Sequence, residues 1–590
     1  MPHTLRRPLP LAGLALLTSS GAAAMTVTVV PSVQPPQPVG TMITFAATVP
    51  DAPTSNLWYR FRVRPERGEY GMIRDYGPLS SLNWTASMHE GGYELEVSAR
   101  DLDTGDESTA SLPFRFVSAV TSGQPVVSPT ANSLVFLYSA PPCDQRSRMR
   151  VRFQALGGTA QNTPFQHCSS GLSMNFYLAG LLPATTYTAQ HILDTGLGSE
   201  SGPAITFTTG NPPSNLYSDT IVLPSPNPFS DPILLGGPLG GNIVANDLSG
   251  NVLWYGPADL TFLTRAEPGG EFWGIVESLQ GAGPAQQVVR KFDLAGMTLL
   301  ETNAARVNEQ LTALGKRTIT GFHHEARPIE GGRVAVLASV EQIVTDTQGP
   351  GPVDVLGDMI IVFDQNLNVV WTWDAFDNLS VNRPAVLGET CPSAGCPAFY
   401  LAPKANDWTH GNALQETADG NILFSIRNQD WLVKISYDHG NGDGHILWRM
   451  GVGGDFQINS SDPYPWFSHQ HDGNFAGSDP TRLLVFDDGN TRVAAMRGGN
   501  SRGQVFQIDE QNFIVNPILN ADLGVYSEAV GSAQLLLDGN YHFDAGFVPE
   551  NNTIDSYSIE VDPAGHMQYE AHQNVILYRT FRMTDLYTPD

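Results

Sequence analysis

The chain has 590 residues and carries 32 lysines and arginines against 59 aspartates and glutamates, a net charge of −27 at pH 7. Nucleic acids and anionic membrane surfaces attract basic proteins, so this balance argues against both as partners. Charged residues make up only 15% of the chain, whereas glycine (58) and proline (43) are frequent. Short runs of Val, Ile, Leu, Thr, Phe and Tyr between Gly, Asp, Asn and Pro turns predict an all-β protein.

Residues 1–24 have the features of a secretory signal peptide. Arg6 and Arg7 form a basic start, residues 9–17 are an apolar core, and residues 21–24 are small enough for cleavage. The apolar core is too short to cross a membrane, and no later stretch approaches the ~18 consecutive apolar residues of a transmembrane helix. We therefore expect a soluble periplasmic or secreted protein without a transmembrane segment.

The four cysteines suit an oxidising compartment, and their even number fits two disulfides. Three pairings are open, and we expect neighbours to pair, as Cys143–Cys168 and Cys391–Cys396. The cysteine spacing does not match a zinc ribbon.

Two small β-sandwich domains are expected before a larger domain. Residues 25–118 contain five alternating strand patterns separated by turns, as in immunoglobulin-like sandwiches. In residues 119–210, the stretch LLPATTY (181–187) followed by ITFTTG (205–210) resembles the tyrosine-corner strand and last strand of fibronectin type III modules. We expect both domains to be spacers or packing modules, because such folds host many unrelated roles.

Residues 211–590 contain an internal repeat. A strand ends in an acidic or polar turn, and a second strand, often ending in Trp, follows it; the copies start near 244, 291, 361, 433, 505 and 559. Between copies lies a glycine turn and an apolar strand, as at 331–337, 419–424 and 538–542. Two hairpin units per repeat make a four-stranded blade, so six repeats predict a six-bladed β-propeller.

Histidines gather at one position of this repeat. The stretches GFHHE (321–325), DWTHGN (407–412) and FSHQHD (467–472) each precede a glycine-turn unit and contain five of the chain's 14 histidines. The innermost strands of a propeller line a central channel, so these stretches should converge at one of its mouths. Converging histidines allow three kinds of chemistry: a metal site, general acid–base catalysis, or a covalent histidine nucleophile.

The strongest candidate is His410, which follows the long loop that contains Cys391 and Cys396. Long loops in compact domains are usually functional or disordered, and a cystine there would hold the histidine still. The propeller half contains no Gly-x-Ser-x-Gly elbow and no phosphate-binding Gly-x4-Gly-Lys-Ser/Thr loop. A nucleotide-type donor therefore has no evident binding loop.

Several strings together resemble the bacterial arylsulfate sulfotransferases. They are FHHE (322–325), NDWTHGNA (406–413), DGNILFSIRN (419–428), ILWRMG (446–451), HQHD (469–472) and LVFDDG (484–489), in the family's order. The resemblance implies a six-bladed propeller behind an N-terminal β domain, with a short-range cystine near the active site. It also implies sulfuryl transfer from a phenolic sulfate ester to a phenolic acceptor through a sulfohistidine, without a nucleotide donor and with no cofactor.

Carried over by motif, His410 matches the nucleophile, His324 or its neighbour His323 matches a histidine that contacts the sulfuryl oxygens, and His471 lines the site. Catalytic roles are thus expected for His410, His324 and His471, and substrate binding for His323, Asn412 and Arg427. Two features depart from the family. The chain has no histidine between His191 and His323, and Gln342 stands near the register of a sulfate-binding arginine, for which Arg427 is a candidate substitute.

Two other functions stay open at this point. One is a non-catalytic secreted propeller that binds a partner through its channel and sandwiches. The other is a metal-dependent lyase or hydrolase with His324, His410 and His471 as ligands. The sequence does not identify the natural donor and acceptor or the oligomeric state, for which a homodimer is one option.

Overall fold

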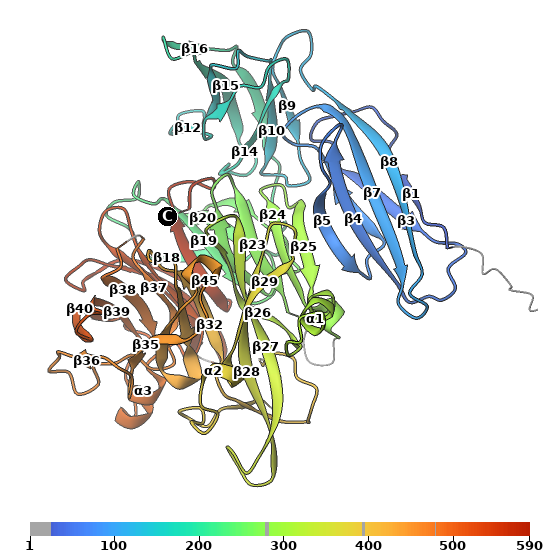
Figure 1. Cartoon of the computed structure of the whole chain (residues 1–590). Coiled ribbons are helices and arrows are strands. Elements are labelled where there is room, and N and C mark those ends of the chain that lie inside the picture. The colour runs from blue at the N-terminus through green and yellow to red at the C-terminus, as the bar shows by residue number, and fades with distance from the viewer. Residues whose placement is uncertain (1–24, 278–282, 392–395, 478, 551, 590) are drawn as a thin grey trace, which may run out of the picture.

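The computed structural model describes residues 25–277, 283–391, 396–477, 479–550 and 552–589, so the expected signal peptide lies outside the described residues. Figure 1 shows a structure made almost entirely of strands, which confirms the all-β prediction. The α-helices of the described part are α1 (Ala304–Ala313), α2 (Ala375–Asn378) and α3 (Asn490–Met496). Among these residues, no helix combines the length and hydropathy needed to cross a membrane.

The strands between residues 25 and 118 form two facing sheets around one apolar core. The first sheet has the order β1 (Thr28–Pro31), β3 (Ile43–Thr48), β6 (Ser81–Trp84). The second runs β2 (Gln37–Pro38), β8 (Glu107–Val117), β7 (Gly91–Asp101), β4 (Leu57–Pro65), β5 (Gly71–Gly77). Alternating residues of both sheets point inward, as in β3, and Phe45, Phe61 and Phe116 are fully buried between them.

Residues 119–210 again contribute two sheets. One is formed by β9 (Val126–Pro129), β10 (Phe136–Ala140) and β14 (Met174–Leu178). The other is formed by β11 (Arg148–Ala155), β12 (Gln161–Asn162), β13 (Gln166–His167), β15 (Thr186–Asp194), β16 (Ser199–Ser201) and β17 (Ile205–Thr208). The disulfide Cys143–Cys168 is present, with a Cα–Cα distance of 5.5 Å. The hydroxyl of Tyr187 accepts the backbone N–H of Leu182 at 2.8 Å, the contact that defines a tyrosine corner.

The remaining chain forms six sheets, each with four main strands that pair in antiparallel fashion. From the innermost strand outward, the first two are β45 (Leu577–Met583), β19 (Ile233–Pro238), β20 (Val244–Asp247), β21 (Val252–Tyr255), and β22 (Phe262–Glu267), β23 (Glu271–Val276), β24 (Val288–Asp293), β25 (Thr298–Asn303). The next two are β26 (Gly321–Ile329), β27 (Arg333–Thr345), β28 (Pro352–Phe363), β29 (Val369–Asp374), and β32 (Gly411–Glu416), β33 (Ile422–Ile426), β34 (Trp431–Ile435), β35 (Ile446–Gly451). The last two are β37 (His471–Phe475), β38 (Arg482–Asp487), β39 (Arg502–Asp509), β40 (Ile514–Asp522), with β36 (Gln457–Ile458) at its edge, and β41 (Gly531–Leu535), β42 (Tyr541–Glu550), β43 (Thr553–Val561), β44 (Met567–Gln573), β18 (Asp219–Leu223).

The innermost strands contact one another in a closed circuit, β22, β26, β32, β37, β41, β45 and back to β22. Each pair of neighbouring sheets buries its own apolar cluster, so both faces of every sheet are covered. The circuit closes because β45, near the C-terminus, pairs with β19, which lies near the start of this part of the chain. Strand β18, which precedes β19, pairs with β44 of the last sheet. We call these six sheets the ring.

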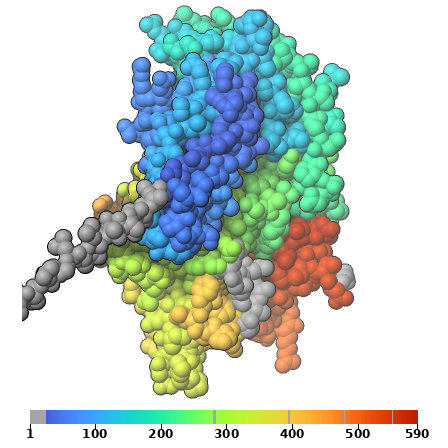
Figure 2. Space-filling view, turned by 90° about the vertical axis from the view of Figure 1, so that its right-hand side faces the viewer, coloured from blue at the N-terminus to red at the C-terminus, as the bar shows by residue number. Residues whose placement is uncertain are grey.

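Charged side chains join the ring to the strands that precede it. Glu301 of β25 accepts from Arg74 of β5 and from Arg290, each at 2.5 Å, and all three side chains are largely buried. A single parallel bridge between Arg74 and Glu301 makes one continuous sheet of the two parts. In Figure 2 the blue N-terminal strands accordingly lie directly on the green surface of the ring. Breaking a buried ion pair leaves an unpaired charge in the interior, which is strongly unfavourable. This contact should therefore hold the two parts in a fixed orientation.

Candidate active site

Three neighbouring innermost strands have a histidine in the left-handed backbone region near their first residue. His324 lies inside β26, His410 directly precedes β32, and His469 lies just before β37. The φ angles are 56° at His324, 52° at His410 and 52° at His469. The pairing of each strand with its outer neighbour also shifts register near these residues. Such conformations are costly for residues other than glycine and concentrate at functional sites. The rings of two of these residues, His324 and His410, lie 4.9 Å apart.

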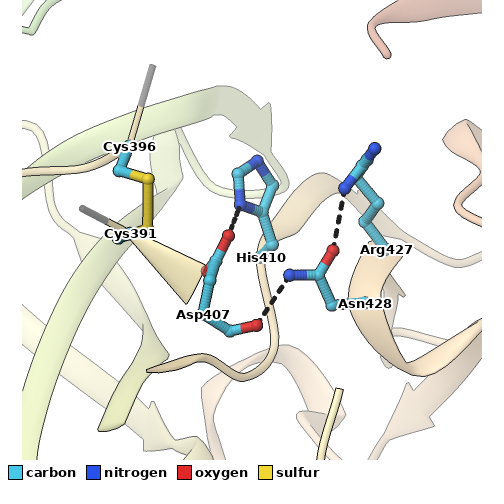
Figure 3. Close-up of a disulfide and its surroundings, with 6 residues drawn as sticks. All are labelled: Cys391, Cys396, Asp407, His410, Arg427 and Asn428. Carbon is cyan, nitrogen blue, oxygen red and sulfur yellow. Dashed lines mark hydrogen bonds and ion pairs between the residues drawn. A yellow bond between two sulfur atoms is a disulfide. The ribbon is translucent and has the colours of Figure 1, made fainter. Parts of the chain in front are cut away.

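His410 forms a dyad with Asp407. Nδ1 of His410 lies 2.5 Å from Oδ2 of Asp407, as Figure 3 shows, while its Nε2 has no hydrogen-bond partner in the described part of the chain. Burial alone would raise the pKa of Asp407, but the charge and hydrogen bond of His410 lower it below its usual value. A carboxylate can only accept, so the proton of neutral His410 is held on Nδ1. The lone pair on Nε2 is thereby left unoccupied, and the side chain is 14% exposed.

His324 presents a second unpaired ring nitrogen. Its Nδ1 lies 2.8 Å from Nδ1 of His323, and its Nε2 has no partner among the described residues. Burial, followed by the neighbouring charges of His410 and His323, lowers the pKa of His324 well below its usual value. His324 is therefore neutral. We infer that it accepts from His323 at Nδ1 and carries its proton on Nε2.

His323 is fully buried behind His324, and its Nε2 lies 3.1 Å from Oδ1 of Asp358 on β28. Burial alone would lower the pKa of His323, but the hydrogen bond and charge of Asp358 outweigh it and raise that pKa. The other oxygen of Asp358 accepts the backbone N–H of Gly411 at 2.6 Å. Asp358 thus ties the His323–His324 pair to the residue that follows His410.

The cystine loop positions the dyad through its backbone. The predicted disulfide Cys391–Cys396 is present (Figure 3), and residues 392–395 within it lie outside the described residues. Strand β30 (Thr390–Cys391) pairs with β31 (Ala405–Asp407), and β31 in turn runs parallel to β28. The next residue, Trp408, is fully buried and donates its backbone N–H to Leu356 at 2.9 Å. Asp407 is therefore built into a sheet.

His471 and Asn412 lie beside the dyad and are engaged by the protein. Nδ1 of His471 lies 2.8 Å from Asp488, and its Nε2 accepts the backbone N–H of Val530 at 3.3 Å. Burial, and then the charge of Arg427, lowers the pKa of His471 well below its usual value. The amide of Asn412 donates to the carbonyl of Gln470 at 2.8 Å. Both residues hold neighbouring strands together, and His471 has no ring nitrogen left for a substrate.

Arg427 lies on the other side of the dyad from the disulfide in Figure 3. Its guanidinium donates to Asn428 at 2.9 Å and to the carbonyl of Glu528 at 3.1 Å, and Asn428 donates to the carbonyl of Asp407 at 2.7 Å. Arg427 also lines a pocket of about 470 Å³ whose other walls are mostly apolar or aromatic, including Leu387, Val493, Ala494, Tyr526, Ala529 and Phe547. A cation at the edge of such a pocket suits an aromatic anion.

Beneath the histidines the channel is filled by paired charges. Arg265 contacts Glu325 at 2.8 Å and Asp472 at 2.7 Å, and Arg579 contacts Glu325 at 3.0 Å. Arg579 also donates to the carbonyl of Asn412 at 2.6 Å, while the adjacent Tyr578 hydroxyl donates to the carbonyl of His324 at 2.8 Å. Neither these contacts nor the one made by Asp358 could be predicted from the sequence. Asp407 belongs to the motif NDWTHGNA (406–413), three residues before His410, but its role as the partner of His410 could not be predicted from that motif.

The ligand set of the alternative metal-dependent function does not come together. Among the described residues, the group whose potential ligand atoms lie within 4.8 Å of one another is Glu330, Glu416 and His439. Glu416 is the last residue of β32, so this group lies at the opposite end of that strand from His410. His324, His410 and His471 form no such group, and their ring nitrogens face His323, Asp407 and Asp488. The geometry therefore favours acid–base or nucleophilic chemistry at this mouth.

A charged clasp holds the dyad loop against the ring. The buried His469 contacts Glu389 through Nε2 and Asp430 through Nδ1, the latter at 2.9 Å. The backbone carbonyl of Glu389 accepts the N–H of Asp407 at 3.0 Å. Burial would lower the pKa of His469, but the hydrogen bonds that its ring donates to the carboxylates of Asp430 and Glu389 raise it above 6.5. Burial would raise the pKa of Glu389, but the hydrogen bond and charge of His469 lower it below 4.5.

These shifts predict how stability depends on pH. The His469 contribution is complete below its unfolded pKa of about 6.5 and is lost as pH rises through its folded pKa. The Glu389 contribution is complete above about 4.5 and is lost as pH falls through its folded pKa. Thermal unfolding of the wild type should therefore show a loss of stability on the alkaline side that His469→Gln removes. His542→Gln is the control, because His542 is equally buried but bonds to Thr580 rather than to a carboxylate. An alkaline loss that is unchanged in His469→Gln would show that the clasp is not its source.

Comparison with known proteins places the chain in a family. The model of the family "Arylsulfotransferase (ASST)" matches residues 237–579, more than half of the chain. A search of curated proteins finds no match. Solved structures with local similarity include a two-domain fibronectin type III segment of chicken tenascin (18% identity, 31% of this chain, 98% of that chain, TM-score 0.14). Another is the purple acid phosphatase PPD1 from yellow lupin (Lupinus luteus) seeds (12% identity, 39% of this chain, 46% of that chain, TM-score 0.15). TM-scores this low carry no argument about the architecture. On the family match, the chain belongs to the arylsulfotransferase family.

Proposed function

We propose that this family member transfers a sulfuryl group from an aryl sulfate to a phenolic acceptor by a ping-pong mechanism, with His410 as the nucleophile. The observation that carries the proposal is the pairing of two unoccupied ring nitrogens at one mouth of the ring. Nε2 of His410 has a lone pair oriented by Asp407, and Nε2 of the adjacent His324 carries a proton. One nitrogen can attack sulfur while the other donates to the oxygen that leaves.

The proposal includes the architecture. The closed circuit of six innermost strands supports a six-bladed β-propeller over residues 211–590. The paired sheets of residues 25–118 and 119–210 support two β-sandwich domains, the second of fibronectin type III character. Their two-sheet form, together with the disulfides, fits a protein exported to an oxidising compartment, in the periplasm or outside the cell.

In the first half-reaction, Nε2 of His410 attacks the sulfur of the donor, an N–S bond forms, and the S–O bond to the aryl oxygen breaks. Asp407 stabilises the positive charge that then develops on the imidazole ring. The Nε2–H of His324 donates to the departing aryl oxygen. In the second half-reaction, the oxygen of the acceptor phenol attacks the same sulfur and the N–S bond breaks.

The pocket beside Arg427 supplies a place for the aryl group. Its walls are mostly apolar and can hold an aromatic ring, and the Arg427 guanidinium, on the side of the dyad away from the disulfide, is the donor that we assign to the non-bridging sulfuryl oxygens. Fixed donors of this kind are worth roughly 3 kcal/mol each in oxyanion sites. We therefore assign to Arg427 the role of the sulfate-binding arginine that the family has near the position of Gln342.

The test is to incubate the purified protein with a chromogenic aryl sulfate, with and without phenol. We expect phenol-dependent release of the chromogenic product and formation of phenyl sulfate. With donor alone, mass spectrometry of proteolytic fragments should find one sulfuryl adduct on His410. Specific binding of aryl sulfates without release or adduct would instead support a non-catalytic binding protein.

A further inference from the structure

His324 needs a source of a second proton if it is to protonate the leaving group. The buried ring of His324 is neutral, with Nδ1 occupied as an acceptor and the proton on Nε2. If Nε2 gave that proton to a leaving aryl oxygen, an imidazolate would remain in a buried site. Isolated buried charges are strongly unfavourable. A second proton must therefore arrive at Nδ1 as the first one leaves Nε2.

His323 is placed to supply it. Its two ring nitrogens face two different partners, Asp358 at 3.1 Å and Nδ1 of His324 at 2.8 Å, and its side chain has no contact with solvent. Besides Asp358, the carboxylates of Glu277 and Asp407 act on His323 and favour its charged form. A protonated His323 can therefore exist in the interior. Among the described residues, the titratable ring to which it is hydrogen-bonded is that of His324.

We propose that His323 and Asp358 form a proton reserve that serves both half-reactions through His324. This inference rests on the proposed function. As the S–O bond of the donor breaks, the aryl oxygen takes the proton from Nε2 of His324, and the proton on Nδ1 of His323 moves to Nδ1 of His324. A neutral phenol leaves. His323 is then neutral with its remaining proton shared with Asp358, and His324 is neutral with a lone pair on Nε2.

The same relay runs backward in the second half-reaction. The acceptor phenol gives its proton to Nε2 of His324 as its oxygen bonds to sulfur and the N–S bond to His410 breaks. The proton on Nδ1 of His324 returns to His323. Every atom and proton is accounted for, and the site regains its starting state. Asp358 couples the relay to the nucleophile, because its second oxygen holds the N–H of Gly411.

The test compares donors whose leaving groups need a proton to different extents. Phenol, with a pKa near 10, needs a proton as it leaves, whereas a nitro-substituted phenol leaves readily as the anion. In single-turnover reactions of the full chain with donor alone, His323→Gln should slow adduct formation from phenyl sulfate by roughly 10²–10³-fold, within the range of general acid–base catalysis. With 4-nitrophenyl sulfate the loss should be less than about 10-fold.

Asp358→Asn provides an independent variant, because the amide oxygen can still accept from Gly411 but no longer stabilises a charged His323. It should show the same dependence on the leaving group, and it decides the question if His323→Gln does not fold. His471→Gln is the matched control. His471 is an equally buried histidine paired with a carboxylate at 2.8 Å, but it has no bond to His324, so any loss should be equal for both donors.

Equal losses with both donors in His323→Gln and Asp358→Asn would overturn the proton reserve and leave the transfer mechanism standing. No adduct in the wild type with either donor would instead overturn the proposed function itself. The two failures are therefore distinguishable in one set of reactions.

Discussion

Replacing His410 by asparagine should abolish sulfuryl transfer, lowering kcat by about five to six orders of magnitude, as in other enzymes that lose a covalent nucleophile. Asparagine has a similar polarity and fits a position with φ of 52°, which its side chain tolerates better than most, so the variant should fold. The amide nitrogen has no lone pair available to attack sulfur. The measurement is steady-state turnover with an aryl sulfate and phenol, together with mass spectrometry after donor alone.

His324→Asn distinguishes the nucleophile from its neighbour. If His324 only donates to the leaving oxygen, turnover should fall about 10²–10³-fold, the range for the loss of one such donor, and the adduct on His410 should still form slowly. The assignment of the nucleophile would be wrong if His410→Asn kept near-normal turnover while His324→Asn or His471→Asn lost the adduct. The nucleophile would then be the histidine whose loss removed it.

The sequence allowed the strands and the histidines to be predicted because both depend on local patterns. Strands buried on both faces appear as short apolar runs, and the turns between them need Gly, Asp and Asn, so the all-β class followed directly. His324 and His410 were recognisable because they stand at the same place in a repeat. Their left-handed backbone, with φ of 56° and 52°, had no signature in residue type, since glycine normally occupies that region.

Contacts between distant residues could not be predicted. Asp358 lies 53 residues before Gly411, and Tyr578 lies 254 residues after His324. Only ring closure through β45 brings Tyr578 and Arg579 against the backbone of His324 and Asn412. The junction between Arg74 and Glu301, 227 residues apart, was likewise invisible, because a single buried ion pair leaves no repeat or spacing in the sequence.

The structure also separates histidines that looked alike in the sequence. His410 and His324 each keep one ring nitrogen unoccupied, whereas His469 and His471 use both of theirs within the protein. All four stand in or next to the same kind of turn. The difference lies in whether the second ring nitrogen has a partner. For His469 and His471 that partner comes from another part of the ring.

Asp407→Asn is expected to lower the rate of adduct formation by roughly 10³–10⁴-fold, although Asp407 itself does not touch sulfur. An amide donates where a carboxylate accepts, so its NH₂ would bind the lone pair on Nδ1 of His410 and push the ring proton onto Nε2. The nitrogen that should attack would then carry a proton. The backbone of residue 407 is held by Glu389 at 3.0 Å and by Asn428 at 2.7 Å, so the loop should keep its position.

A matched control exists in the turn that precedes β35. Asp443 bonds to Nδ1 of His445 at 2.5 Å, the same distance as in the dyad, but on an exposed turn where the His445 side chain is 60% exposed. Asp443→Asn should leave both turnover and melting temperature unchanged. Adduct formation in Asp407→Asn at a rate close to that of the wild type would mean that Asp407 does not set the tautomer of His410. In that case the unoccupied Nε2 would owe its lone pair to some other contact, and the dyad would be structural.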